Sequence, residues 1–268
     1  MSISVASEFL RTRRRTVGLR DIPLVFFAPT RLFAKVEDVN AYLVPLFLLL
    51  ALVTLVGYAT IETGLIDRRV QEQVNTMKAH LEKSQFEVME RAQFRKALED
   101  LDKQGQFLRL ITRLQVVVMS PVGMLTGILL TAAVFYGLVA LSGRKPEWNT
   151  LMTVQTYACY IDLLRFAGVL FFMVSFRRLN VDLTLGALVG PMEMNFPYGG
   201  MVRAGLKTLL AAADPFALWY WWVVIAGLKT TGQLRGWLMW LSCISMALCG
   251  AALRVLGAVA MNMAPAQG

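Results

Sequence analysis

Long runs that are almost free of charged residues alternate with short polar connections along most of the chain. Each run has about 20 residues or more, the length that a helix needs to cross the hydrocarbon core of a membrane. The pattern predicts an all-α integral membrane protein built as a bundle of five transmembrane helices. The predicted spans are residues 42–60, 116–141, 151–176, the helix that starts at Pro215 within the stretch 209–229, and residues 237–261.

The fourth of these runs carries the strongest local signals. Pro215 lacks a backbone N–H and has a preset φ, so it suits the first turn of a helix. Asp214, directly before it, can accept hydrogen bonds from the free N–H groups of that turn. Four consecutive aromatic residues follow at 219–222, and such rings favour the boundary between headgroups and hydrocarbon. The stretch therefore predicts a helix that starts at Pro215 and enters a bilayer.

Residues 62–115, between the first two spans, form a charged amphipathic helical segment outside the membrane. Residues 62–113 hold nine acidic and ten basic side chains. Apolar residues recur there at helical spacing, and Gly105 is predicted to end the helix. One amphipathic helix cannot bury such a seam alone, so we expect either a helical hairpin or an external partner. The seam, our candidate partner-binding surface, consists of Val70, Val74, Met77, Leu81 and Val88.

The remaining segments set the expected topology. Residues 1–40 mix basic and apolar side chains, with five arginines between 11 and 20, and form either an interfacial segment or a short soluble arm. Basic clusters favour the cytoplasmic side, so we expect a cytoplasmic N-terminus and an extracytoplasmic segment 62–115. The connection 177–214 is either re-entrant or an external cap, and residues 263–268 form a tail.

Composition supports a membrane protein. The chain is 56% hydrophobic and only 17% charged, against about 25% charged residues in soluble domains. Its net charge of +9 does not indicate nucleic-acid binding, because the cations cluster beside apolar runs, where they anchor the chain on anionic lipid. The three cysteines lie in apolar stretches without a CxxC pair and are predicted to be buried thiols, with no metal site.

Three charged residues lie inside predicted spans: Asp162, Arg165 and Arg254. Asp162 and Arg165 are three residues apart and share one helix face, where they can pair. Charges at membrane depth face protein or water. The three residues therefore form either a structural ion-pair network between helices or the path of a small solute or ion, and the second alternative would make the protein a permease.

Enzyme signatures are absent from the sequence: it has no HExxH, no P-loop and no GxSxG motif. The one histidine, His80, has no second metal ligand at useful spacing. Polar residues of the third run are predicted to form helix–helix hydrogen bonds; they are Gln155, Tyr157, Cys159 and Tyr160. We therefore expect no catalytic residues and no cofactor.

Short motifs carry a family resemblance. DPFALW at 214–219, followed by VIAGL at 224–228, resembles the DxFxLW…GL segment of the bacterial branch of the YIP (Ypt-interacting protein) family. APTRLF at 28–33 is similar to the stretch before that family's first span, and Pro45 is similar to its membrane proline. TVQTYA at 153–158 fits the start of the third span. The residues that carry the resemblance are Pro29, Phe33, Pro45, Asp214, Pro215, Phe216, Trp219 and Gly227.

The resemblance implies a non-enzymatic protein with five spans. Eukaryotic relatives act with Rab-type GTPases, and some bacterial relatives are thought to accompany ABC-type export machinery. The leading hypothesis is therefore an accessory or scaffold protein of the bacterial inner membrane, embedded in lipid. It would dock through residues 62–113 to a membrane partner such as an ABC transporter subunit. Whether the chain forms a homo-oligomer stays open.

Overall fold

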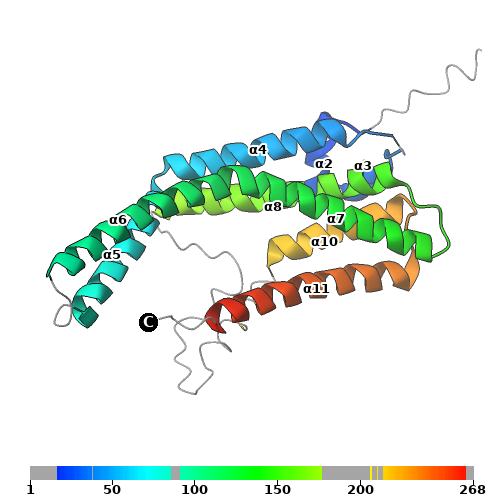
Figure 1. Ribbon diagram of the computed structural model, residues 1–268. Helices are drawn as coiled ribbons and strands as arrows, with labels where there is room; N and C mark the ends of the chain where they lie inside the picture. Colours follow the sequence, from blue (N-terminus) through cyan, green and yellow to red (C-terminus); the bar gives the residue numbers. More distant parts are fainter. Residues whose placement is uncertain are drawn as a thin grey trace, which may run out of the picture. The chain divides into compact units, whose positions relative to one another are not determined.

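The computed structural model describes residues 17–37, 39–85, 91–176, 206, 210 and 214–263 (Figure 1). Within these ranges the side chains of residues 80, 82–85, 91, 92, 254 and 257–263 are not described. The described residues are helical or lie in turns and connections, which confirms the all-α class. The helices are η1 (Leu19–Asp21), α2 (Ile22–Phe27), α3 (Pro29–Phe33), α4 (Leu43–Glu62), α5 (Leu65–Gln85), α6 (Arg91–Leu114), the π-helical η2 (Gln115–Met119), α7 (Ser120–Leu141), α8 (Trp148–Phe176), α10 (Pro215–Thr230) and α11 (Gly236–Met263).

The chain divides into two compact units. Unit 1 comprises Met1–Leu49, Thr126–Arg165 and Asp182–Gly268, and unit 2 comprises Leu50–Leu125 and Phe166–Val181. The helices α4, α7 and α8 each contribute residues to both units.

The N-terminal half of α8 forms the centre of unit 1. Every residue from Thr150 to Ile161 is buried. A helix enclosed in this way must satisfy its own polar side chains, because buried polar groups without partners are costly. Thr153 does so by donating its hydroxyl to the carbonyl oxygen of Asn149 at 2.7 Å. The apolar third run is therefore a core helix of unit 1 from Thr150 to Ile161.

Two short helices before the first predicted span belong to the same unit. Proline in the first turn starts both α2 and α3, since its missing N–H costs nothing there. Val25, Leu32 and Phe33 are buried, and α3 packs along α10. The part of 1–40 that the structure describes is therefore packed into unit 1 and is not a free soluble arm.

Four helical stretches are long and apolar enough to cross a membrane: Leu43–Glu62, Gln93–Leu141, Trp148–Phe176 and Gly236–Leu253. They correspond to the first, second, third and fifth predicted spans. The expected fourth, α10, has 16 helical residues, or about 24 Å, against a hydrocarbon core of about 30 Å. Pro215 sets its start, and the turn after Thr230 ends it. The fourth predicted span, and with it the count of five spans, is therefore not established by the described residues.

In unit 2, α5 and α6 pack against each other as a helical hairpin, one of the two expected arrangements. Gly105 does not end a helix, contrary to the sequence-based prediction, because α6 continues through it to Leu114. A Cβ at Gly105 would lie 2.8 Å from Cγ2 of Val74. The role of Gly105 is therefore to allow α5 and α6 to approach closely, and not to end the helix.

Helix α6 continues into the membrane-type helix α7 through the π-turn η2. The uninterrupted stretch Gln93–Leu141 has 49 residues, about 74 Å, so it extends well beyond one hydrocarbon core. A Cβ at Gly57 of α4 would lie 2.9 Å from the carbonyl oxygen of Val116 in η2. The glycine lets α4 pack directly on the backbone of the π-turn.

Candidate functional site

Asp214 precedes α10 and is fully buried in unit 1. Its Oδ1 accepts a 2.9 Å hydrogen bond from the backbone N–H of Phe216, which confirms the predicted N-cap. Its Oδ2 lies 2.8 Å from Nε of Arg165 on α8. Oδ2 accepts no hydrogen bond from the described residues, so this contact is an ion pair with poor N–H alignment. Arg165 supplies the countercharge that a buried carboxylate needs.

A second polar contact joins α8 and α10. The hydroxyl of Tyr220 donates a 2.7 Å hydrogen bond to Oε1 of Gln155, whose side chain is 1% exposed. Nε2 of Gln155 is also buried and finds no hydrogen-bond partner among the described residues. The Tyr220 hydroxyl therefore satisfies one end of a deeply buried amide.

Replacing Tyr220 with phenylalanine should destabilise unit 1 by about 1–3 kcal/mol, because both ends of the Gln155 amide would then be buried without partners. The loss is measured as a lower Tm of the purified protein in mild detergent. The matched control is Tyr136→Phe, since the Tyr136 side chain is 40% exposed, and its effect should stay below about 0.5 kcal/mol. Equal melting of the two variants would contradict a structural role for this contact.

Two further tyrosines of α8 hold the N-terminal elements of unit 1. Tyr157 donates a 3.1 Å hydrogen bond to the carbonyl oxygen of Gly18. Tyr160 donates a 2.7 Å hydrogen bond to the carbonyl oxygen of Pro45 in the first turn of α4. The predicted helix–helix hydrogen bonds of the third run are thus observed for Gln155 and Tyr160, whereas Tyr157 bonds to Gly18, which directly precedes η1.

The predicted charge network of Asp162, Arg165 and Arg254 is only partly described. Asp162 and Arg165 lie on α8, while Arg254 lies on α11 with its side chain outside the described atoms. The ion pair of Arg165 adds Asp214, which sequence reasoning assigned to the connection and to a capping role alone. A signal was available, because a carboxylate that caps an apolar helix lies close to membrane depth. The network of the three predicted residues stays a prediction.

The residues that carry the family resemblance meet in the packing of α3, α8 and α10. A Cβ at Gly227 would lie 2.6 Å from Cγ1 of Val154 and 3.2 Å from Cε2 of Phe33. Near the start of α10, the ring of Trp219 packs edge-on against Phe26, with centroids 5.8 Å apart. Residues of these motifs therefore pack the helices of unit 1 against one another.

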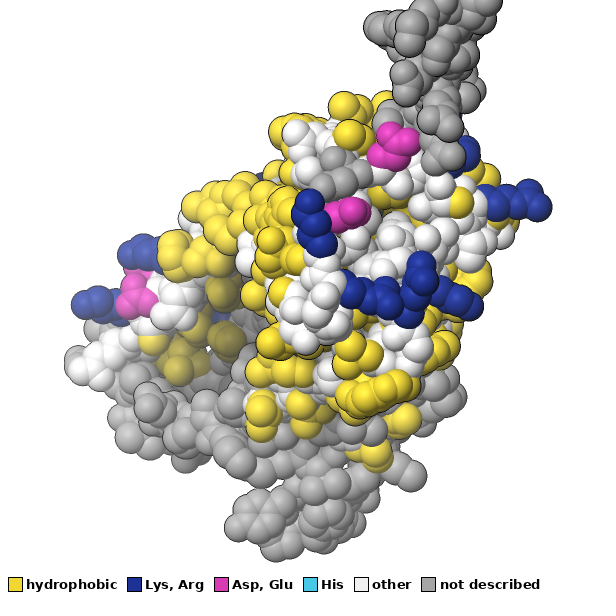
Figure 2. Space-filling view, turned by 90° about the vertical axis from the view of Figure 1, so that its right-hand side faces the viewer, with side chains coloured by type: hydrophobic (Ala, Val, Ile, Leu, Met, Phe, Trp, Pro, Cys, Tyr) yellow, Lys and Arg dark blue, Asp and Glu magenta, His cyan; other side chains and the backbone are white. Residues whose placement is uncertain are grey.

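Hydrogen bonds join the α7–α8 and α10–α11 connections at one end of unit 1, which faces the viewer in Figure 2. Nη1 of Arg144 donates a 2.6 Å hydrogen bond to the carbonyl oxygen of Gly232, and Nε2 of Gln233 donates one of 3.0 Å to Oε2 of Glu147. Lys and Arg side chains gather on this face beside hydrophobic ones (Figure 2). The exposed cations of the two connections and their flanks are Arg144, Lys145, Lys229 and Arg235.

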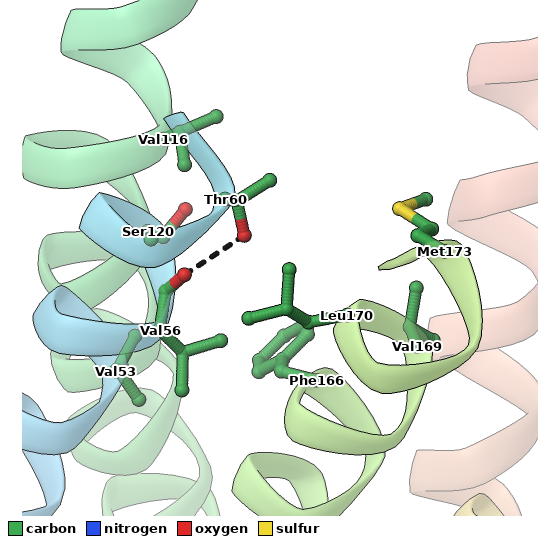
Figure 3. A pocket seen from close by; sticks show the side chains of 10 residues that line it. Val53, Val56, Thr60, Val116, Ser120, Phe166, Val169, Leu170 and Met173 are labelled. Atoms are coloured by element: carbon green, nitrogen blue, oxygen red, sulfur yellow. Dashed lines mark hydrogen bonds between the residues drawn. The ribbon is translucent and has the colours of Figure 1, made fainter. Parts of the chain in front are cut away.

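Unit 2 contains an apolar pocket of about 160 Å³ between its own helices (Figure 3). Val53, Val56 and Thr60 of α4 line one side, and Phe166 and Leu170 are among the α8 residues opposite. The Thr60 hydroxyl donates to the carbonyl oxygen of Val56 at 2.8 Å, so it offers little free polarity to a ligand. The pocket suits an apolar chain or side chain.

An exposed apolar stripe runs along the C-terminal part of α6 and continues into η2, which directly follows α6. Phe107, Leu110, Leu114 and Val118 recur every three or four residues and are 61%, 64%, 53% and 41% exposed. Residues at this spacing share one helix face. We name these four residues the α6 stripe. The stripe was not predicted from the sequence, although its spacing of three or four residues indicates an apolar helix face.

The predicted seam is largely used inside the hairpin. Val70 and Val74 are 4% and 3% exposed, and Val74 contacts α6 at Gly105. Met77 is 49% exposed, Leu81 is half-buried and Val88 lies outside the described residues. Among the described residues of the predicted seam, Met77 is therefore the most exposed.

The three cysteines are free. Cys159 and Cys243 are buried, as predicted, but Cys249 is exposed on α11, so the prediction is wrong for that residue. Among the described residues, no group of three or more His, Cys, Asp or Glu side chains is placed to hold a metal ion.

Comparison with known proteins identifies the family of this chain. The family model described as the Yip1 domain matches residues 24–256, from α2 into α11. No curated protein and no solved structure matches the chain. The match covers most of the sequence, including the capped helix α10 and the helices that can cross a membrane. The chain therefore belongs to the Yip1 domain family and is a multi-pass membrane protein.

Proposed function

We propose that the protein is a non-enzymatic accessory or scaffold protein of a bacterial inner membrane that docks to another membrane protein through unit 2. The partner class is a membrane subunit of the type found in ABC-type export systems. We further propose five spans, with α10 as the fourth, a cytoplasmic N-terminus and an extracytoplasmic hairpin. The observation that carries this proposal is the exposed α6 stripe.

The stripe differs from an ordinary lipid-facing surface in its position. It begins in α6, whose charged residues make it unsuited to the hydrocarbon core, and continues into η2 beside the membrane-type helix α7. Because the continuous helix Gln93–Leu141 is longer than the hydrocarbon core, the part of this apolar face that lies on α6 would project out of the membrane. Apolar surface in that place supports contact with a partner that also projects from the membrane.

The hairpin supports this role because contacts between α5 and α6 stabilise it without a partner. Nζ of Lys78 lies 2.7 Å from Oδ1 of Asp102, and Nη2 of Arg113 lies 2.6 Å from Oδ2 of Asp67. Arg109 also donates a hydrogen bond to Gln71. These contacts cross from α5 to α6, so the hairpin needs no partner for its own seam. The α6 stripe stays available to one.

The alternative function, passage of a small solute or ion along Asp162, Arg165 and Arg254, has less support. Arg165 is engaged by the buried Asp214, and this pair neutralises itself. A flux of solute or ion through the reconstituted protein, abolished by Asp162→Asn, would favour the permease.

The double substitution Phe107→Ser with Leu110→Ser should weaken partner binding roughly tenfold or more, because two large apolar side chains would no longer be buried in the interface. The tagged chain is purified in mild detergent from its native membrane, and the bound proteins are quantified. An ABC-type permease or its adaptor should be recovered with the unsubstituted chain and lost with the variant.

The matched control is Leu19→Ser with Phe27→Ser. These residues are 44% and 87% exposed, belong to unit 1 and lose the same two side-chain types. The control should retain the partner, and limited proteolysis of residues 62–113 should be unchanged in both variants. Recovery of the same partner with the stripe variant, or of the chain alone without substitution, would argue against the proposal.

A further inference from the structure

Unit 1 has a groove of about 930 Å³ between α10 and α11, lined also by Thr30 of α3. Ala226 and Met239 are buried in it, at 7% and 3% exposed. Three tryptophans, Trp222, Trp237 and Trp240, line it and are 50%, 74% and 52% exposed. The groove is therefore open to its surroundings and largely apolar.

Two exposed cations, Lys229 and Arg235, line the same groove. A tight turn brings them to one end of it: Gly232 has φ +75°, and the N–H of Leu234 donates to the carbonyl oxygen of Leu228 at 3.4 Å. Within the part of the chain that the structure describes, neither cation takes part in one of the observed ion pairs. The groove thus has a basic end and an apolar length.

The basic end also holds the start of a helix, because Gly236, which lines the groove beside Arg235, is the first residue of the long helix α11. The N–H groups of a first helical turn have no partner within the helix, and they attract negative charge. Cations beside the first N–H groups of a helix together favour a phosphate group.

We propose that this groove binds an anionic phospholipid, with the headgroup phosphate at Lys229 and Arg235 and an acyl chain along Ile225, Ala226 and Trp222. Charge complementarity selects the headgroup, and the apolar length selects a lipid over a soluble phosphate compound. Tryptophan rings suit the headgroup boundary, where such a lipid would lie. Basic pockets beside transmembrane helices are suited to anionic lipid headgroups. The site is independent of the docking surface in unit 2.

The test uses the full chain in nanodiscs of phosphatidylcholine with a small fraction of phosphatidylglycerol. Either lipid carries brominated acyl chains, which quench tryptophan fluorescence on contact, and three of the six tryptophans of the chain line the groove. Brominated phosphatidylglycerol should quench more strongly than brominated phosphatidylcholine at equal fraction. Lys229→Gln with Arg235→Gln should reduce this preference roughly 30-fold. Each cation near the membrane surface contributes about 1 kcal/mol to the binding of an anionic lipid, and the loss of both corresponds to that factor.

The matched control is Arg20→Gln with Lys145→Gln, which removes two exposed cations of unit 1 that do not line the groove. It should keep the preference within roughly twofold, because neither side chain lines the groove and salt screens exposed charges that do not contact the lipid. Ile225→Phe, which narrows the groove without a charge change, should also weaken quenching and serves if the charge variant fails to fold. Equal loss in the charge variant and the control, or no preference in the unsubstituted chain, would overturn the proposal. Competition by inorganic phosphate as effective as the lipid would overturn the assignment of a lipid.

Discussion

Asp214→Ala is expected to destabilise unit 1 by about 3 kcal/mol or more, because it leaves the charge of Arg165 without its buried partner. The side chain of Asp214 is inaccessible to solvent, whereas that of Arg165 is 27% exposed. Partial access to solvent lets water offset some of the penalty, which places the loss at the lower end for broken buried pairs. About 1 kcal/mol of it should come from the lost N-cap of α10. The measurement is thermal unfolding in detergent, followed by tryptophan fluorescence.

Asp214→Asn separates the two roles, since asparagine caps a helix as well as aspartate does but carries no charge. It should retain the cap and lose only the ion pair, so its loss of stability should be smaller than that of Asp214→Ala. Adding Arg165→Gln should recover part of the stability that Asp214→Asn loses, because the guanidinium that has lost its partner Asp214 would be removed. If Asp214→Ala melted like the unsubstituted protein, the ion pair and the cap would both be irrelevant to stability.

Gly227→Ala is expected to cost about 1–3 kcal/mol through overpacking. The added methyl group would lie 2.6 Å and 2.9 Å from the two Cγ atoms of Val154 and 3.2 Å from a ring carbon of Phe33. Val154 is itself fully buried, so it has little room to move. The measurement is the Tm in detergent together with the yield of monodisperse protein.

Two comparisons make this result specific. Gly137→Ala in α7, where an added Cβ meets nothing within 4 Å, should be neutral or slightly stabilising, because alanine is the better helix former. Val154→Ala should restore part of the stability of Gly227→Ala by opening space for the new methyl group. Equal effects of the two glycine substitutions would show that helix propensity, not the α3–α8–α10 contact, determines the outcome.

The sequence was most informative where the cause is local. The start of α10 follows from Pro215 and Asp214, because a preset φ and a capping carboxylate act within one helical turn. The apolar runs likewise predicted α4, α7, α8 and α11, since length and composition decide whether a helix can span. Family membership also rests on such short stretches, in agreement with the Yip1 domain match.

Some features depend on contacts between distant segments, and only the tertiary structure determined them. Glycine reads as a helix stop in a sequence, but Gly105 lies inside α6 because Val74 of another helix occupies the space of a side chain. Spacing offers Arg165 the partner Asp162, three residues away, but only the structure shows the ion pair of Arg165 with Asp214, 49 positions further on in the chain. The length of α10 depended on where the chain turns after Thr230. Local preferences set where helices begin and how apolar they are, whereas packing between distant segments determines which side chains pair and which faces remain exposed.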